Sequence, residues 1–368
     1  MNLRSPFKPA VTAGVVLGAL VLVAAGCGSD NGGGGGGGGK IALLLPESHT
    51  ARYESQDRPH FEAQLKKSCS DCQVLYSNAG EDAARQQQQA EAALTKGAKV
   101  LVVDAVDAGS AGAIVQKAKA QKVPVISYDR LITNADIDYY ISYENARVGK
   151  LQADALVKKL EQDGKGSGTI VQINGDPADH NATLFKQGAT SVFKSSKLKV
   201  GKSYDTPGWL GKNAQNEMEQ AITALGNGGF VGAYVANDTL AGAAIAAMKG
   251  AGIKPSTRPT TGQDAELAGI QRILNGEQFM TVYKDFGIHE STQAAELAAD
   301  LAKGNKPSSD QYKVKVNNGK KDVPSLLLTP VAVTKDNIKD TIIKDKFWTA
   351  SQICTKAYAS ACKAAGIQ

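Results

Sequence analysis

Short apolar runs alternate with longer amphipathic stretches along most of the chain, from Lys40 onward. The runs are rich in Val, Ile and Leu, which is typical of buried strands, and the stretches between them carry the apolar spacing of helices. We expect strands at 41–45, 74–76, 100–103, 124–127, 169–173, 198–203, 231–235 and 280–283. We expect helices at 53–67, 82–96, 108–120, 145–162, 183–193, 213–225 and 240–251, with the glutamines at 86–89 on a solvated helix face. Strands alternating with helices predict parallel sheets with right-handed crossovers.

The strand–helix pattern restarts after Tyr143, so it predicts an α/β protein with two doubly wound parallel-sheet lobes joined by a hinge. The chain after Lys40 is long enough for two domains, each with its own core. We assign residues 40–143 and 285–325 to lobe 1, residues 144–284 and 326–350 to lobe 2, and residues 351–368 to a C-terminal extension. In such sheets ligands bind beyond the carboxyl ends of the strands, and a cleft between two lobes would collect these ends from both sides.

The N-terminus has the pattern of an export signal. Arg4 and Lys8 precede a small-to-apolar run that is too short and too poorly flanked to span a membrane. The run ends at Leu22-Val23-Ala24-Ala25-Gly26-Cys27, which resembles the lipobox of bacterial lipoproteins. We therefore expect a signal peptide at 1–26, a lipid-anchored Cys27 outside the cytoplasm, and a flexible glycine-rich tether at 27–39. The alternative is an ordinary secretory signal that leaves Cys27 as a free thiol.

Four further cysteines suit an oxidising compartment, and they allow three pairings. We expect the two local disulfides, Cys69–Cys72 and Cys354–Cys362. The CxxC spacing at 69–72 is also that of thioredoxin-like redox sites. Such a motif normally opens a helix after a strand, whereas this one follows a helical pattern and precedes a strand, which favours a structural disulfide. No histidine lies at ligand spacing beside the cysteines, so no metal site is expected.

Charge and motifs argue against several other classes. The net charge is only +6 over 368 residues and no dense Lys/Arg block occurs, so nucleic acid is not an expected partner. The glycines before Lys40 do not form a P-loop, because Ile41 stands where Ser or Thr is needed. Neither a nucleophile elbow nor an H-E-x-x-H motif occurs, and we expect neither a catalytic residue nor a cofactor. A transcription regulator of the same lobed fold would need a DNA-reading segment where the signal and tether stand.

Polar side chains follow many of the predicted strands, at the edge where ligands bind in such sheets. Each has a common structural explanation, such as a surface ion pair or a helix cap, but their shared position favours a binding site. The candidates are Arg52, Tyr53, Asp129, Arg130, His180, Asn181, Trp209, Asn237, Asp238, Asp264 and Lys284.

Several ordered motifs carry a resemblance to a known family. They include 128–132 with 135–142, Gly175-Asp176-Pro177 before Asn181-Ala182, Gly208-Trp209, Asn237-Asp238, 262–270, 281–284, 317–319 and 322–325. These stretches resemble the type I periplasmic sugar-binding proteins of bacterial ABC transporters, and among them those for D-xylose, over roughly residues 40–348. The chain departs from the pattern in its four cysteines and its end after Trp348, in His180 where Asn is expected, and in Tyr53 where Trp often stands.

The resemblance implies a monomeric, membrane-anchored lipoprotein that captures a monosaccharide and delivers it to an ABC permease. Arg52, Arg130 and Lys284 would donate hydrogen bonds to sugar hydroxyls, Asp129 and Asp264 would accept them, and Asn181 and Asn237 would do both. Trp209, and after it Tyr53, would cover a C–H face of the ring. The lobes would close by bending of the segments that pass from one lobe to the other, near Tyr143, Lys284 and 317–327. The alternatives are a sugar sensor for a membrane receptor, or another aldose such as glucose, galactose, arabinose or ribose.

Overall fold

The computed structural model describes residues 38–367. Its strands are β1 (Lys40–Leu45), β2 (Gln73–Asn78), β3 (Ala98–Val103), β4 (Val125–Tyr128), β5 (Tyr139–Tyr143), β6 (Thr169–Asn174), β7 (Lys199–Asp205), β8 (Gly232–Val235), β9 (Met280–Tyr283), β10 (Val314–Asn317), β11 (Asp322–Leu328) and β12 (Val331–Thr334). Its α-helices are α1 (Arg58–Ser68), α2 (Ala83–Thr95), α3 (Gly112–Ala120), α4 (Asn145–Gln162), α5 (His180–Ser195), α6 (Gly211–Leu225), α7 (Asp238–Gly250), α8 (Leu267–Leu274), α9 (Thr292–Ala302), α10 (Ala350–Ile353) and α11 (Ala359–Ala364). The π-helical turns η1 (Tyr53–Asp57), η4 (Phe286–Ser291) and η6 (Lys339–Ile343), with the 3-10 turns η2 (Pro207–Trp209), η3 (Pro255–Thr257) and η5 (Lys335–Asn337), complete the set.

Every strand and helix expected from the apolar pattern is present, with ends that differ by a few residues. The expected helix at 53–67 is divided, because its first turn is the π-helical turn η1. β5, the strands from β10 to β12 and the helices from α8 to α11 are additional. The predicted class, an α/β protein with parallel sheets, is confirmed.

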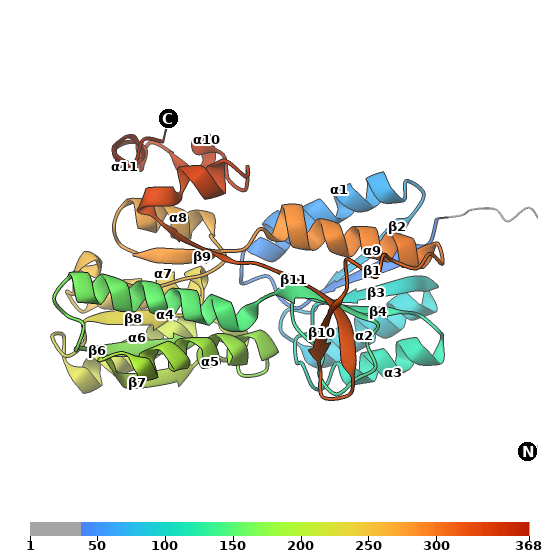
Figure 1. Cartoon of the computed structure of the whole chain (residues 1–368), viewed down its shortest axis with the longest axis horizontal. Coiled ribbons are helices and arrows are strands. Elements are labelled where there is room, and N and C mark those ends of the chain that lie inside the picture. Colours follow the sequence, from blue (N-terminus) through green and yellow to red (C-terminus); the bar gives the residue numbers. More distant parts are fainter. Residues whose placement is uncertain (1–37, 368) are drawn as a thin grey trace, which may run out of the picture. The chain divides into compact units, whose positions relative to one another are not determined.

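The first lobe is built on a seven-stranded sheet in the order β10-β11-β5-β4-β3-β1-β2 (Figure 1). All its pairings are parallel except the hairpin of β10 and β11. Alternate residues of β1 face opposite layers: Ala42 and Leu44 pack with α2 and α3, whereas Leu43 and Leu45 pack with α1 and α9. The central strands are therefore apolar on both faces, which explains their continuous Val/Leu runs.

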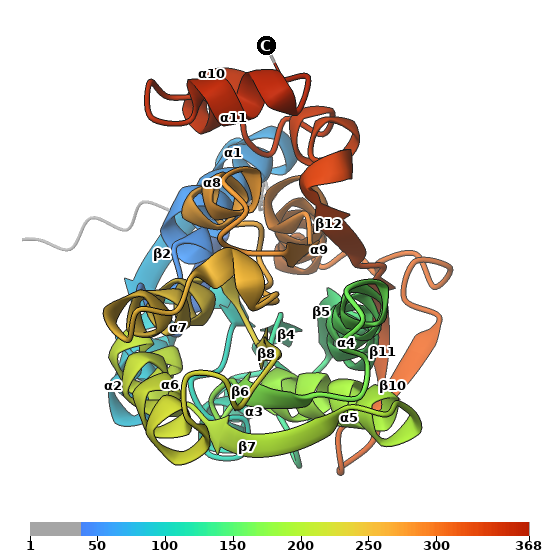
Figure 2. The ribbon, with the colours of Figure 1, turned by 90° about the vertical axis from the view of Figure 1, so that its left-hand side faces the viewer.

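The second lobe has a parallel sheet in the order β7-β6-β8, and an antiparallel pair of β9 and β12. Isolated bridges from Ala233 to Thr260 and from Gln263 to Val282 link the two. Figure 2 shows α4 and α5 on one side of the sheet, and α6 and α7 on the other. Their apolar faces form one core around β6 and β8.

Three segments connect the lobes: β5 to α4, β9 to η4, and β11 to β12. Because β11 pairs with β5 as far as Leu328, the last connection follows that residue and spans only 329–330. These short connections, rather than long linkers, hold the carboxyl ends of the two sets of strands opposite each other.

Both expected disulfides are present. Cys69–Cys72 closes the turn between α1 and β2, and Cys354–Cys362 joins α10 to α11. The second bond lies in an apolar cluster with Ile353 and residues of α8. Cys27 and the tether, by contrast, lie outside the described residues.

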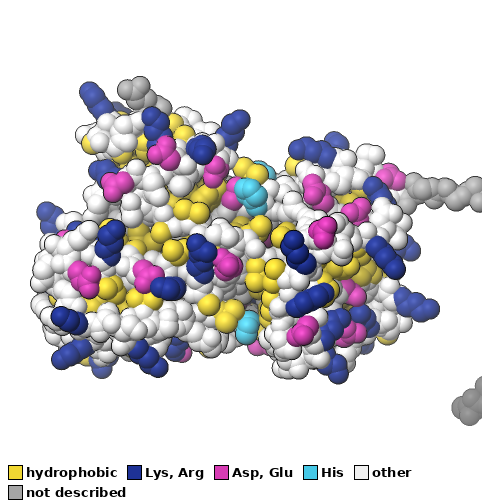
Figure 3. Space-filling view, viewed as in Figure 1, with side chains coloured by type: hydrophobic (Ala, Val, Ile, Leu, Met, Phe, Trp, Pro, Cys, Tyr) yellow, Lys and Arg dark blue, Asp and Glu magenta, His cyan; other side chains and the backbone are white. Residues whose placement is uncertain are grey.

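Charged side chains of both signs are mixed on the surface. On the face shown in Figure 3, Lys and Arg are interspersed with Asp and Glu. No helix within residues 38–367 combines the length and apolar composition needed to cross a membrane.

One expectation about α2 is wrong. Gln86 does not lie on a solvated face: its side chain is buried, its amide donates to the Asp104 carbonyl at 2.7 Å, and its oxygen accepts from Val106 N–H at 3.0 Å. Only Gln88 of this run is fully exposed. The amide of Gln86 thus satisfies two buried backbone groups just past the end of β3.

Gln86→Ala should therefore lower the free energy of unfolding by about 2–3 kcal/mol, because two buried backbone groups lose their partner. Gln88→Ala on the same helix is the matched control and should change it by less than about 0.5 kcal/mol. Urea unfolding followed by circular dichroism measures both. Equal effects of the two substitutions would contradict this role for Gln86.

Candidate functional site

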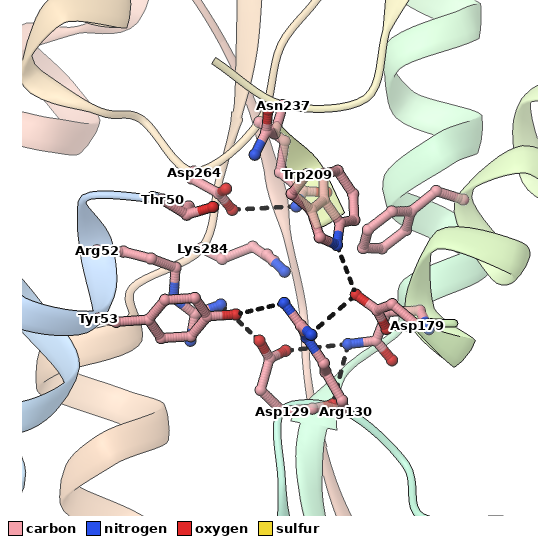
Figure 4. Close-up of a pocket in the computed structure, with 13 residues that line it drawn as sticks. Thr50, Arg52, Tyr53, Asp129, Arg130, Asp179, Trp209, Asn237, Asp264 and Lys284 are labelled. Atoms are coloured by element: carbon pink, nitrogen blue, oxygen red, sulfur yellow. Dashed lines mark hydrogen bonds and ion pairs between the residues drawn. The ribbon is translucent and has the colours of Figure 1, made fainter. Parts of the chain in front are cut away.

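A cavity lies between the carboxyl ends of the two sets of strands (Figure 4). The space between its lining atoms, part of it open to solvent, is about 290 Å³. Charged, amide and aromatic side chains line it: Thr50, Arg52, Tyr53, Asp129, Arg130, Asp179, Asn181, Phe185, Trp209, Asn237, Gln263, Asp264 and Lys284.

The structure brings nine of the eleven candidate residues to this cavity and leaves two outside it. His180 and Asn181 are neighbours at the start of α5, and successive helix residues point in different directions. Asn181 therefore faces the cavity, whereas His180 lines a separate surface groove with Leu184. Asp238 is buried beneath the cavity, where its carboxylate accepts from Glu266 N–H and Thr281 Oγ1, each at 3.0 Å.

Four lining residues were not among the candidates: Thr50, Asp179, Phe185 and Gln263. Asp179 and Gln263 are next to candidate residues just past strand ends. The criterion that selected those neighbours, a polar side chain directly after a predicted strand, could therefore have found them as well. Phe185 shares the apolar face of α5 with the core, and nothing in the sequence separates it from a core residue. No feature of the sequence around Thr50 marks it as a binding residue.

Arg52 is held by carboxylates of the first lobe. Its guanidinium pairs with Asp57 through two hydrogen bonds of 2.9 and 2.6 Å, and with Asp129 at 2.6 Å. It also stacks on the ring of Phe286, with 3.2 Å between Cζ and the ring centroid. Burial would raise the pKa of Asp129, but Arg52 and Lys284 outweigh it and lower that pKa below its ordinary value. Asp129 is therefore ionised and offers a negative charge to the cavity.

Arg130 connects the lobes. Its Nε lies 3.2 Å from a carboxylate oxygen of Asp179 in the second lobe, and its Nη2 donates to the Tyr53 hydroxyl at 3.2 Å. The Nε1–H of Trp209 donates to the same Asp179 oxygen at 3.2 Å. Burial raises the pKa of Asp179, and Arg130 opposes that shift. One carboxylate thus orients both a cation and the indole of Trp209.

The indole of Trp209 also depends on the absence of a side chain at Gly175. A Cβ at Gly175 would lie 2.0 Å from Cη2 of the indole. The ring therefore packs flat against the backbone at the end of β6, and it forms an apolar wall of the cavity.

Lys284 brings an unpaired cation to the cavity. It is 2% exposed, and no carboxylate oxygen within residues 38–367 lies closer than 4.0 Å to its Nζ. Three aromatic rings surround this ammonium at 4.9–5.4 Å, those of Tyr143, Phe185 and Phe286. Burial raises the pKa of Asp264, and Lys284 opposes that shift. Asp264 and Lys284 supply an acceptor and a donor from the second lobe.

Two amides complete the polar lining. Asn181 donates to both the side chain and the carbonyl of Asp129, at 3.1 and 3.0 Å, and so bridges the lobes. The oxygen of Asn237 accepts from Leu240 N–H at 2.9 Å and caps α7. Figure 4 shows the nitrogen of Asn237 directed toward the cavity.

Three lining residues have left-handed backbone conformations: Asp129 (φ 53°), Trp209 (φ 51°) and Asp264 (φ 88°). Such conformations cost about 1–3 kcal/mol each in a residue other than glycine, and they cluster at functional sites. Contacts with the surrounding residues must stabilise these three strained conformations, which direct the three side chains toward the cavity.

The arrangement suits binding better than catalysis. The lining alternates ionised donors and acceptors around an aromatic wall, and each carboxylate at the cavity lies near a cation. A polyhydroxylated ring needs such a set, because each charged group can hold hydroxyls and a flat ring can cover C–H groups. None of the lining residues is a cysteine, serine or histidine that could act as an activated nucleophile.

Comparison with known proteins agrees with this geometry. The model of the periplasmic binding protein domain family matches residues 41–306. The chain is 41% identical to the D-xylose-binding periplasmic protein of Escherichia coli over 320 residues, which cover 85% of this chain and 92% of that protein. Its identity to the protein of the same name from Haemophilus influenzae is 38% over 343 residues, covering 92% and 97%. A crystal structure of an ABC transporter solute-binding protein from Clostridium phytofermentans with bound β-D-glucose has a TM-score of 0.76 and 29% identity, covering 85% of this chain and 99% of that one.

Beneath the cavity, two buried carboxyl groups predict a dependence of stability on pH. Burial raises the pKa of Asp238 to about 7, and burial together with Asp238 raises that of Glu266 to about 8. The ordinary values are about 4. The folded chain therefore binds more protons than the unfolded chain between about pH 4 and pH 8, and the free energy of unfolding falls as pH rises through that range.

Glu266→Gln should reduce this fall by on the order of 1 kcal/mol or more between pH 5.5 and pH 8.5, because it removes one titrating group and the negative charge beside the other. Urea unfolding at both pH values measures it. The exposed Glu219→Gln on α6 is the control and should keep the parent's slope. A Glu266→Gln variant with that same slope would contradict the assignment.

Proposed function

This chain belongs to the periplasmic binding protein family, as an extracytoplasmic sugar-binding member and not an enzyme, and from this premise we propose that it binds D-xylose in the cavity between its lobes. The observation that carries the proposal is the lining itself. Donors from Arg52, Arg130 and Lys284 stand opposite acceptors from Asp129 and Asp264, with Trp209 as a flat apolar wall. This is the set of groups that a pyranose requires at its rim and on its faces.

Closure of the lobes is the proposed mechanism of capture. Arg130 reaches Asp179, and Asn181 reaches Asp129, so residues of one lobe complete the contacts of the other only when the lobes are together. A sugar that touches both sides stabilises the closed arrangement and shifts the population toward it. Bending would occur at the short connections after Tyr143, Tyr283 and Leu328.

The identity of the sugar rests on the two D-xylose-binding relatives. Glucose is the strongest competitor, because it is the ligand in the similar Clostridium structure. We propose that the sugar-loaded closed form is delivered to an ABC permease; a membrane-bound sensor is the second candidate.

Calorimetric titration with xylose, glucose, galactose, arabinose and ribose tests the sugar. D-xylose should bind most tightly. Asp264→Ala should weaken its binding by about 2–4 kcal/mol, roughly 30- to 1,000-fold, because a charged acceptor is lost. Trp209→Ala should weaken it without changing the order of sugars. The exposed Asp310→Ala is the matched control and should bind as the parent does. Binding of no monosaccharide below millimolar concentration would overturn the proposed function.

We also propose that Cys27 is the acylated first residue of the mature chain and that residues 27–39 act as its tether. Mass spectrometry of membrane-extracted protein should find a diacylglyceryl group on a peptide that begins at Cys27. Cys27→Ala should release the protein from the membrane fraction. A native N-terminus at another residue, without acyl chains, would refute the anchor.

A further inference from the structure

The last helices of the chain lie against the part of the second lobe that carries Asp264 and Lys284. Figures 1 and 2 both show α10 and α11 beside α8. The side chain of Gln271 in α8 donates to the Ile353 carbonyl at 3.2 Å. We call residues 347–367 the C-terminal clasp. The cavity uses none of its residues directly.

One contact of the clasp reaches the backbone beside Asp264. The Nε1–H of Trp348 donates to the Ala265 carbonyl at 2.8 Å. Asp264 and Ala265 form a turn in which both residues have positive φ, 88° and 50°. Ala265 is fully buried. A turn of two strained residues persists only where its surroundings hold it, and Trp348 satisfies its central carbonyl.

A second contact reaches the side chain of Tyr283, the residue before Lys284. The ring of Phe347 packs edge-on against Tyr283 at 5.1 Å and against Trp348 at 5.5 Å between centroids. Neighbouring aromatic residues of the clasp therefore contact the chain next to both charged residues that the second lobe brings to the cavity.

The disulfide closes the clasp behind these aromatic residues. Cys362, bonded to Cys354, is buried in the same apolar cluster as Ala265, Ile270 and Ile353. The bond restricts the short hairpin of α10 and α11 in the unfolded clasp, and so favours its docking on α8.

We propose that the C-terminal clasp is a positioning element for the sugar site: Trp348 and Phe347 hold the Asp264–Ala265 turn and the Tyr283–Lys284 segment in their binding geometry. The effect on sugar affinity rests on the proposed function, whereas the effect on the turn does not. Without the clasp the turn relaxes, and sugar binding must then restore its strained conformation.

Two variants of the full chain test the clasp. Trp348→Phe removes the indole donor, and the double variant C354S/C362S opens the hairpin. Each should weaken xylose binding about 3- to 10-fold, the range expected for one lost hydrogen bond. The double variant C69S/C72S, which opens the disulfide of the first lobe, is the matched control and should keep the parent's affinity.

The combined effect of two substitutions on sugar affinity distinguishes a positioning role of the clasp from a general loss of stability. Because Trp348 acts through the turn that carries Asp264, adding Trp348→Phe to Asp264→Ala should produce little further loss of affinity. An additive loss would show that the clasp does not act through Asp264 and would overturn the proposal.

Hydrogen exchange without sugar tests the turn even if no monosaccharide binds. Amides of residues 262–270 should exchange faster in Trp348→Phe and in C354S/C362S than in the parent, while those of α2 remain unchanged. Unchanged exchange at 262–270 overturns the clasp whatever the sugar titration shows. If the parent binds no sugar but the two variants still exchange faster than the parent at 262–270, the clasp is supported and only the proposed function is refuted.

Discussion

The burial of two guanidinium groups, those of Arg52 and Arg130, is the constraint on which the rest of the site depends. Neither charge could remain in the interior without carboxylates beside it, because an unpaired buried ion costs several kcal/mol. Asp57 and Asp129 neutralise Arg52, and Asp179 reaches Arg130 from the opposite lobe. Asp104 of the first lobe also lies 3.5 Å from Nε of Arg130, so the contact with Asp179 adds a further carboxylate and favours the closed arrangement of the lobes. The same residues place hydrogen-bond donors and acceptors around the cavity.

Two means preorganise the side chains of the site: contacts around a side chain, and strained backbone. In the first lobe, Arg52 is fixed by hydrogen bonds and by stacking on Phe286, so its position follows from partners around the side chain. Strained backbone orients Asp129 in the same lobe, and Asp264 and Trp209 in the second. Three aromatic rings surround the ammonium group of Lys284. A strained backbone conformation persists only where neighbouring residues prevent it from relaxing. Side chains that it orients therefore depend on packing by residues outside the site.

The apolar pattern was sufficient to predict the layers of the fold, because strands buried on both faces are conspicuous in sequence. It was less informative where polar residues are buried. Gln86 looks like any surface glutamine, yet it satisfies the backbone at the end of β3. His180 and Asn181 are adjacent in sequence, but successive positions of α5 point in different directions. Asn181 therefore lines the cavity, and His180 lines a surface groove. A preference for polar residues after strands cannot resolve a difference of one helical position.

Asp238 illustrates a second limit of sequence reasoning. Its position after a strand matches that of a ligand residue, but its carboxylate is fully used by Glu266 N–H, Thr281 and Gln278, which places it in the support beneath the cavity. Glu266 begins the backbone leading into α8 directly after the Asp264–Ala265 turn. Two hydrogen bonds therefore stabilise the turn: Asp238 accepts from Glu266 N–H directly after it, and Trp348 donates to the Ala265 carbonyl within it. A negative charge near Lys284 depends on both supports, one from within the lobe and one from the end of the chain.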